Sequence, residues 1–227
     1  MKVTLINYSQ GPFENIMGVD VPSKRSLLDQ VAYCARVSNP SNQNNTETSE
    51  KLVRYLVKNQ HWSPLEMVSV CLEIETTRDI ARQILRHRSF SFQEFSQRYA
   101  DASQLGFETR EARLQDLKNR QNSIETDNLA IHTWWENYQK EVIRVAGAAY
   151  QFALDKGIAK EQARAVLPEG ITKSRIYMNG TLRSWVHYIQ LRSANGTQKE
   201  HQEVALACAD AIEPIFPMIK EYVNEQP

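Results

Sequence analysis

The sequence predicts a helix-rich α+β protein built around a small, mostly antiparallel sheet. Residues 67–76 alternate apolar and polar side chains, which is typical of a strand with one buried face. Several longer segments instead repeat apolar residues at the spacing of amphipathic helices. No internal repeat or low-complexity tract interrupts the 227 residues, so we expect a single catalytic domain over residues 1–227.

The sequence of the first part of the chain predicts one strand and two helices. Alternation around Val3 indicates a short opening strand. Apolar residues then recur at helical spacing over 27–35, behind Ser23 or Ser26 as the candidate N-cap. A second amphipathic helix is expected over residues 52–57.

The alternating strand is followed by residues that predict a helix and then an extended stretch. The helix is expected to run from Arg78 to about Arg88. On that helix Gln83, Arg86 and His87 would share one face through three- and four-residue spacing. An extended stretch over 94–98 would let this region address one ligand from two directions.

The remainder of the chain predicts mostly helices. Residues 101–126 are polar and poorly periodic, which indicates an excursion over the surface. The longest helix is expected over about 128–156, with Trp134-Trp135 in the core or at a subunit interface and Gly157 as its C-cap. Asn179-Gly180 predicts a turn. Further helices are expected over 161–167, 182–192 and from about 198 onward.

Charge and cysteine content argue against several classes of protein. Lys+Arg and Asp+Glu number 27 each, so the formal net charge is zero, unlike that of a general nucleic-acid binder. Cys34, Cys71 and Cys208 are odd in number and widely spaced, which favours buried thiols over disulfides. Neither a signal peptide nor a membrane span is evident. We therefore expect a cytoplasmic protein that binds neither nucleic acid nor membranes.

One stretch, residues 86–99, has the composition of a ligand-binding cleft. It begins with Arg86-His87-Arg88 and continues with Glu94, Ser96 and Arg98, between which aromatic residues are interspersed. Guanidinium groups form bidentate contacts with phosphate and carbonyl oxygens, and aromatic rings offer stacking surfaces. We therefore expect a ligand that is flat, polar and negatively charged.

This stretch resembles the signature of the flavin-dependent thymidylate synthases, the ThyX family, in which Arg-His-Arg is followed after seven residues by serine. Here that serine is Ser96. The resemblance covers roughly residues 27–220 and includes three further motifs in the family's order. These motifs are His61-Trp62-Ser63-Pro64-Leu65-Glu66, Arg164-Ala165-Val166-Leu167-Pro168 and the segment from Thr181 to Arg192.

The resemblance implies a ThyX-like fold and a methyltransferase that converts dUMP to dTMP. In that family, methylenetetrahydrofolate provides the carbon, and NADPH provides reducing equivalents through FAD. FAD is therefore the implied cofactor, with NADPH and methylenetetrahydrofolate as cosubstrates. The resemblance also implies a homotetramer whose sites are shared between subunits.

Residue roles follow from the same resemblance. It implies that dUMP contacts Gln83, Arg86, Glu94, Ser96, Gln97, Arg98, Arg164 and Arg192. It implies that FAD contacts His61, Ser63, Arg86, His87, Arg88, Glu94, Thr181, Arg183 and His187. Arg192 would be the catalytic residue, lying against the uracil ring, where a cation favours the ionised and more nucleophilic ring. No covalent protein nucleophile would then be required.

Other interpretations stay open at the level of sequence. Ser96 could be a nucleophile, although no neighbouring residue is an evident base. The spacing of His61, His87, His187 and His201 matches no metal-binding motif, so no metal site is expected. A single-strand nucleic-acid binder that stacks bases on residues 86–99 is one alternative function. A flavoprotein that binds a nucleotide without methyl transfer is another.

Overall fold

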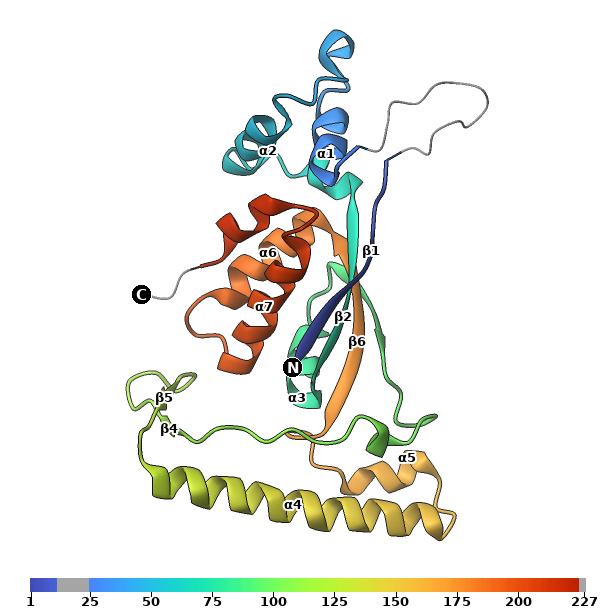
Figure 1. Cartoon of the computed structure of the whole chain (residues 1–227), viewed down its shortest axis with the longest axis vertical. Helices are drawn as coiled ribbons and strands as arrows, with labels where there is room; N and C mark the ends of the chain where they lie inside the picture. The colour runs from blue at the N-terminus through green and yellow to red at the C-terminus, as the bar shows by residue number, and fades with distance from the viewer. Residues whose placement is uncertain (12–24, 225–227) are drawn as a thin grey trace.

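The computed structural model describes residues 1–11 and 25–224, and the chain forms a helix-rich α+β fold (Figure 1). A four-stranded antiparallel sheet has the order β1-β2-β6-β3. Its strands are β1 (Lys2–Tyr8), β2 (Ser69–Thr77), β3 (Phe90–Glu94) and β6 (Lys173–Thr181). The predicted fold class, a helix-rich protein with a small, mostly antiparallel sheet, is confirmed.

The centre of the sheet confirms one predicted strand and contains another that the sequence pattern did not predict. Val70, Leu72 and Ile74 of β2 are fully buried on one face, as their alternation predicts. β2 pairs along its whole length with β6, and the turn predicted at Asn179-Gly180 is wrong because both residues lie within β6. Gly180 is needed for a close approach, since a Cβ there would lie 2.3 Å from the Phe90 ring.

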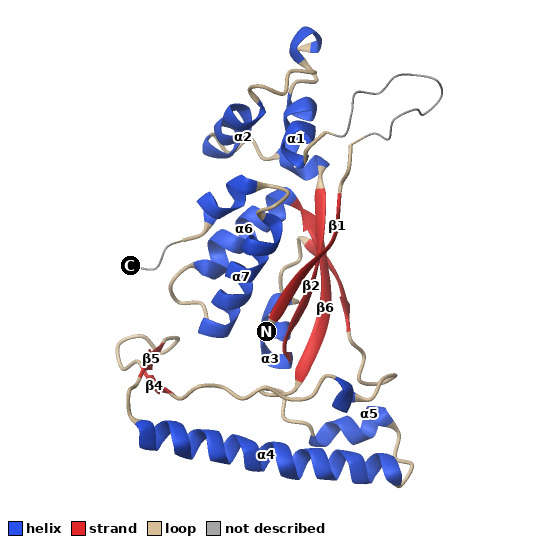
Figure 2. Ribbon diagram, viewed as in Figure 1, coloured by secondary structure: helices blue, strands red, loops and turns tan. Residues whose placement is uncertain are grey.

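Two C-terminal helices, α6 (Leu182–Ser193) and α7 (Lys199–Ile212), cover one face of the sheet (Figure 2). Thr181 caps α6 as the sequence predicts, because its side chain accepts a hydrogen bond from the backbone N–H of Ser184. Trp185 is fully buried and donates its indole N–H to the carbonyl of Val70 over 3.0 Å. This hydrogen bond fixes α6 against β2.

The N-terminal helices α1 (Leu27–Ala35) and α2 (Ser49–Lys58) pack together near one end of the sheet (Figure 1). Both helices were predicted, and Ser26 caps α1 by accepting a hydrogen bond from the backbone N–H of Asp29. The alternative cap, Ser23, lies outside the described residues. Short 3₁₀ helices occur at Pro40–Asn42, Ser63–Met67, Ala102–Gln104, Arg164–Val166 and Pro217–Tyr222.

The region of the Arg-His-Arg motif differs from the prediction. Helix α3 spans Arg78–Ile84, so the helix predicted to reach Arg88 is four residues too long. The chain must leave the helix early because β3 begins at Phe90 and pairs with β6. The extended stretch predicted over 94–98 is also wrong, since residues 97–99 form a turn in which the backbone N–H of Tyr99 bonds the carbonyl of Ser96.

The excursion over residues 101–126 contains a two-stranded hairpin that the sequence did not predict, β4 (Arg113–Gln115) and β5 (Ser123–Glu125). It leads into α4 (Leu129–Asp155), which was predicted, with Asn128 as its N-cap and Gly157 at a φ of 74° after its end. Helix α5 spans only Lys160–Ala163 before a 3₁₀ turn, so the helix predicted over 161–167 is corrected.

Helix α4 lies along the edge of the fold and leaves much of its apolar surface uncovered (Figure 1). Trp134, Tyr138 and Phe152 are 58%, 55% and 62% exposed, although Trp134 was predicted to lie in the core or at a subunit interface. The buried residues of α4 are Gln139, Ala146, Tyr150 and Ala153. Trp134 is therefore outside the core of this chain, and the apolar face has no cover within the described residues.

The three cysteines are free thiols, as predicted. Only Cys208 is buried, whereas Cys34 and Cys71 are half-buried, which corrects the expectation of three buried side chains. None of the described helices is both long and apolar enough to cross a membrane.

Candidate active site

The turn after α3 brings the predicted catalytic residue into contact with a predicted flavin-binding residue. The guanidinium Nε of Arg192, near the end of α6, donates a hydrogen bond to Nε2 of His87 over 2.9 Å. His87 Nε2 therefore accepts, and the neutral ring carries its hydrogen on Nδ1. Burial, and then the positive charges of Arg192 and Arg86, lower the pKa of His87 to about 4. His87 is thus a neutral acceptor near pH 7.

Gln83 reaches the same region from the last turn of α3. Its side-chain N–H donates to the carbonyl oxygen of Gln198 over 2.8 Å, and its own carbonyl oxygen lies 3.2 Å from Nδ1 of His201. The His87 and Tyr188 rings are in edge contact, with centroids 4.9 Å apart. We name Gln83, His87, Tyr188, Arg192 and His201 the Arg192 cluster.

A second group of predicted flavin-binding residues gathers around the start of α6. Arg183 forms an ion pair with Glu66. The Trp62 and His187 rings meet edge to face at 4.4 Å. Burial, and then the charge of Arg183, lower the pKa of His187 below its ordinary value. We name His61, Trp62, Ser63, Glu66, Thr181, Arg183 and His187 the α6 N-terminal cluster.

Hydrogen bonds to the backbone position the two segments that carry this second cluster. Gln60 adopts a left-handed conformation with φ of 59°, and the backbone N–H of His61 bonds the carbonyl of Leu56 over 2.8 Å, which ends α2. At the other end, the hydroxyl of Ser184 donates to the carbonyl of Ser89 over 3.1 Å. This bond joins the start of α6 to the turn that carries Arg-His-Arg.

Four of the predicted dUMP-binding residues form a third group beside α5. Arg98 Nε bonds the carboxylate of Glu161 over 3.3 Å, and Arg164 Nε donates to the backbone carbonyl of Glu161 over 3.3 Å. The Ser96 hydroxyl accepts from the backbone N–H of Arg98 over 3.4 Å. Gln97 is buried, and its side-chain nitrogen has no hydrogen-bond partner. We name Ser96, Gln97, Arg98 and Arg164 the Ser96 cluster.

Glu94 lies apart from these groups, at the end of β3. It accepts a hydrogen bond from the Ser174 hydroxyl over 2.8 Å and lies 3.6 Å from Arg78. Between the Ser96 and Arg192 clusters, the described residues provide no connecting hydrogen bond or ion pair. The residues predicted to bind dUMP are therefore separated into groups on one chain.

The donors near the Arg-His-Arg turn fit an anionic dinucleotide cofactor. Arg86 and Arg88 are both exposed, and neither guanidinium forms a hydrogen bond or ion pair with any described residue. Free guanidinium groups suit pyrophosphate. The imidazoles of the α6 N-terminal cluster and the indole of Trp62 offer flat surfaces nearby. FAD therefore fits the residues present.

Sequence reasoning missed several members of these groups. Tyr188, Gln198 and Glu66 were assigned no role, and His201 entered only as a possible metal ligand. Its buried place could not be predicted, because it depends on how α7 packs against α6 and α3. The described residues contain no group of three His, Cys, Asp or Glu side chains that could hold a metal ion.

Free guanidinium groups, a neutral imidazole and aromatic surfaces define the class of protein as one that binds flat, anionic ligands. Comparison with known proteins identifies the family. A family model described as "Thymidylate synthase complementing protein" matches residues 25–218. A "Probable flavin-dependent thymidylate synthase" of Paramecium bursaria Chlorella virus 1 is 49% identical over 194 residues, covering 86% of this chain and 89% of that protein.

One further relative and one solved structure support the same family. A "Flavin-dependent thymidylate synthase" of Synechocystis sp. is 49% identical over 189 residues, covering 83% of this chain and 86% of that protein. The crystal structure of the UMP/dUMP methylase PolB from Streptomyces cacaoi, bound with 5-Br dUMP, has a TM-score of 0.78 at 27% identity. It covers 97% of this chain and 93% of that one. The chain therefore belongs to the family of flavin-dependent thymidylate synthases, and this membership implies FAD as its cofactor.

Proposed function

We propose that the protein methylates dUMP to dTMP, with methylenetetrahydrofolate as the carbon donor and NADPH as the source of reducing equivalents. The observation that carries this proposal is the position of Arg192. Its Nε donates to His87, while its two terminal nitrogens bond no described residue and are free to donate hydrogen bonds to a ligand. A guanidinium held in this way offers two parallel donors to a carbonyl group.

Arg192 would activate the uracil ring through its charge. A cation beside the ring carbonyl favours the ionised form of the ring, as it favours any nearby acid in its charged form. The ionised ring is the better carbon nucleophile, so no covalent protein nucleophile is required. The thiol of Cys208 is fully buried and burial raises its pKa, which argues against its use as a nucleophile.

Three groups of residues would hold the two ligands. Bound FAD supplies the hydride, after reduction by NADPH. Arg86 and Arg88 would bind its phosphates. The other FAD contacts would come from His61, Ser63, His87, Glu94, Thr181, Arg183 and His187. The dUMP phosphate would lie on Ser96 and Arg98 with Arg164, and the base on Gln83 and Arg192. Glu94, Gln97 and Arg86 would complete the nucleotide site.

We also propose a homotetramer with sites shared between subunits. Two observations support it. The Ser96 and Arg192 clusters share no hydrogen bond or ion pair among the described residues of one chain, which supports a dUMP site that draws on two subunits. The exposed apolar face of α4, which includes Trp134 and Tyr138, is also the kind of surface that a subunit interface covers. The three free thiols agree with a cytoplasmic location.

The proposed reaction is tested with purified protein, dUMP, methylenetetrahydrofolate and NADPH, by chromatography of the nucleotide product. We expect a yellow protein that forms dTMP only when all three are present. UMP is tried as a second substrate, since PolB is described as a UMP/dUMP methylase. A colourless protein without turnover would contradict the proposal. NADPH oxidation without dTMP would favour the flavoprotein that lacks methyl transfer.

Shared sites are tested by mixing two inactive variants. Arg98→Ala and Arg192→Ala each damage a different part of the proposed dUMP site. Co-expressed chains would form some sites in which both arginines are intact, provided that the two come from different subunits. We expect the mixed oligomers to regain dTMP formation that neither variant has alone. Mixed oligomers as inactive as the single variants would place both arginines of each site on one chain.

A further inference from the structure

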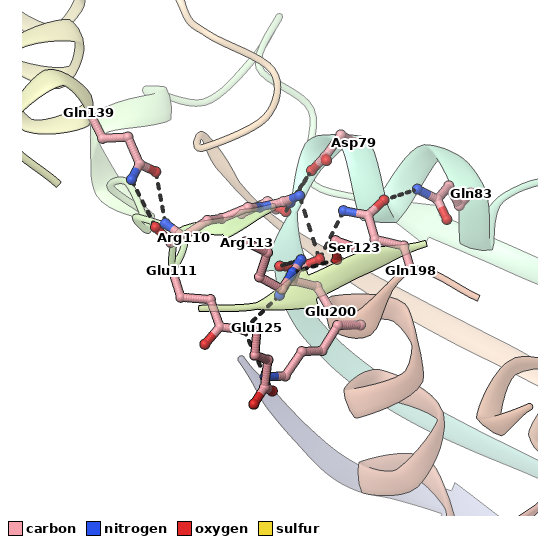
Figure 3. A network of polar contacts seen from close by, with 12 residues as sticks. Asp79, Gln83, Arg110, Glu111, Arg113, Ser123, Glu125, Gln139, Gln198 and Glu200 are labelled. Carbon is pink, nitrogen blue, oxygen red and sulfur yellow. Dashed lines mark hydrogen bonds and ion pairs between the residues drawn. The ribbon is translucent and has the colours of Figure 1, made fainter. Parts of the chain in front are cut away.

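A chain of hydrogen bonds connects the half-buried carboxylate of Glu200 to the buried Tyr188 through Gln83. Gln198 donates its side-chain N–H to Glu200 Oε2 over 2.9 Å and accepts from Gln83 over 2.8 Å (Figure 3). Beyond Gln83, His201 Nδ1 lies 3.2 Å from the Gln83 carbonyl oxygen, and His201 Nε2 lies 3.1 Å from the Tyr188 hydroxyl. His201 and Tyr188 are 0% and 1% exposed.

Glu200 determines the direction of every bond in this chain. Burial raises the pKa of its carboxyl, but hydrogen bonds from its own backbone N–H, from Arg113 and from Gln198 outweigh burial and lower the pKa. The ionised carboxylate can only accept, so the Gln198 NH₂ must face it. The Gln198 carbonyl then faces Gln83 and requires the Gln83 NH₂. Figure 3 shows this ordered series of side chains.

The same sequence of donors and acceptors determines which ring nitrogen of His201 carries the hydrogen. With its NH₂ directed at Gln198, Gln83 presents its carbonyl oxygen to His201, so Nδ1 of His201 must carry the hydrogen. Nε2 then accepts from the Tyr188 hydroxyl. Burial, and then the charges of Arg192 and His87, lower the pKa of His201 to about 3, so the ring is neutral near pH 7.

We propose that His201 is a positioning residue that fixes the amide of Gln83 for the pyrimidine base of the nucleotide. An amide has two N–H donors and two carbonyl lone pairs, and the chain uses one of each. One donor and one acceptor of fixed orientation are left for a ligand. This arrangement suits uracil, whose edge offers a ring N–H beside a carbonyl. The inference rests on the proposed function, because it takes Gln83 as a dUMP contact.

Loss of His201 would remove one of the two hydrogen bonds that hold the Gln83 amide and would leave the bond to Gln198 in place. In His201→Leu the Gln83 carbonyl loses its partner, so the amide is held only by the bond of its NH₂ to Gln198 and its plane can swing about that bond. In His201→Asn the side-chain NH₂ can replace the Nδ1 donor. We expect His201→Leu to weaken dUMP binding about tenfold, the usual effect of one lost hydrogen bond. We expect His201→Asn to stay within about threefold of wild type.

The experiment measures dUMP dissociation constants on FAD-loaded protein, with dCMP as the competing base. An amide held only by Gln198 orients its free donor and acceptor less strictly, so His201→Leu should also reduce the preference for dUMP over dCMP. Wild-type dUMP affinity in folded His201→Leu would overturn the proposal. His201→Asn as weak as His201→Leu would overturn it too, because only packing would then matter. FAD content and thermal unfolding confirm that each variant is folded.

The histidine tautomer gives an independent measurement on the wild-type protein, even if His201→Leu fails to fold. Nitrogen-15 NMR of histidine-labelled protein distinguishes hydrogen on Nδ1 from hydrogen on Nε2. The His201→Asn spectrum assigns the signal, because only the His201 resonances are lost from it. We expect a neutral Nδ1–H ring at pH 7, and an Nε2–H ring would overturn the proposal. Wild-type protein that binds no dUMP would instead contradict the proposed function, while the tautomer still tests the His201–Gln83 bond.

Discussion

Gly180→Ala tests how β6 and β3 hold the Arg-His-Arg turn. Gly180 lies inside β6 and pairs with Val70 on one side and Phe90 on the other. An added Cβ would lie 2.3 Å and 2.5 Å from two ring carbons of Phe90, well inside van der Waals contact. The backbone of β6 is held by a strand on each side, so the Phe90 ring must move.

The ring has little room to move. Its centroid lies 4.8 Å from that of Trp185 and 5.9 Å from that of Tyr188, which are both buried. Overpacking of this kind costs about 1–3 kcal/mol. In a domain of this size each kcal/mol lowers Tm by about 2–4 °C, so we expect Gly180→Ala to lower Tm by about 2–12 °C.

The assay is thermal unfolding followed by circular dichroism at fixed protein and FAD concentration. Gly147→Ala is the matched control, because its Cβ in α4 meets only Phe107 at 3.9 Å. There the same substitution should stabilise the helix by about 0.5–1 kcal/mol. Phe90→Leu should relieve the clash, so the double variant should cost less than the sum of the two single variants. A Tm for Gly180→Ala at or above wild type would refute the reasoning.

Three other substitutions or conditions give separate tests. Arg98→Ala should weaken dUMP binding in a titration yet change unfolding free energy by less than about 1 kcal/mol, because its ion pair with Glu161 is exposed; unchanged dUMP affinity would argue against a phosphate contact. Gln60→Gly should raise stability to urea by about 1 kcal/mol, since φ is 59° there; equal or lower stability would contradict this. The pKa of His201 is about 3 in the folded chain against 6.5 ordinarily, so its contribution to stability is complete above pH 6.5 and lost as pH falls. The free energy of unfolding, measured by melting at pH 7, 6 and 5, should depend less on pH in His201→Asn than in the wild type, by up to about 1.4 kcal/mol per pH unit. Identical slopes in the two proteins would count against a neutral buried ring.

Local patterns in the sequence predicted many of the elements that the structure contains. β2 was predictable because its alternating residues face one core, and α6 because Thr181 caps it. The early end of α3 was not predictable, since no residue from Leu85 to Arg88 disfavours a helix. It is set by the pairing of β3 with β6, which joins residues about 90 positions apart. β6 itself was missed because Asn179-Gly180 has the composition of a turn.

The candidate site also has a part that the sequence predicted and a part that it did not. The family resemblance assigned Arg192 to dUMP and His87 to FAD, and the two side chains are in contact. The place of His201 was not predictable, because its burial depends on the packing of three helices. The separation of the Ser96 cluster from the Arg192 cluster was likewise invisible in the sequence. The single-domain boundary and the residue roles stay predictions.

Turnover of Arg192→Ala tests the central claim most directly. The variant removes the guanidinium proposed to activate uracil, and exposed Arg120→Ala serves as the control. The formation of dTMP from NADPH, dUMP and methylenetetrahydrofolate is measured together with FAD content. We predict that Arg192→Ala keeps its FAD but loses at least about 100-fold in turnover, as when one preorganised donor is removed. Arg192→Ala that forms dTMP at close to the wild-type rate would contradict the account.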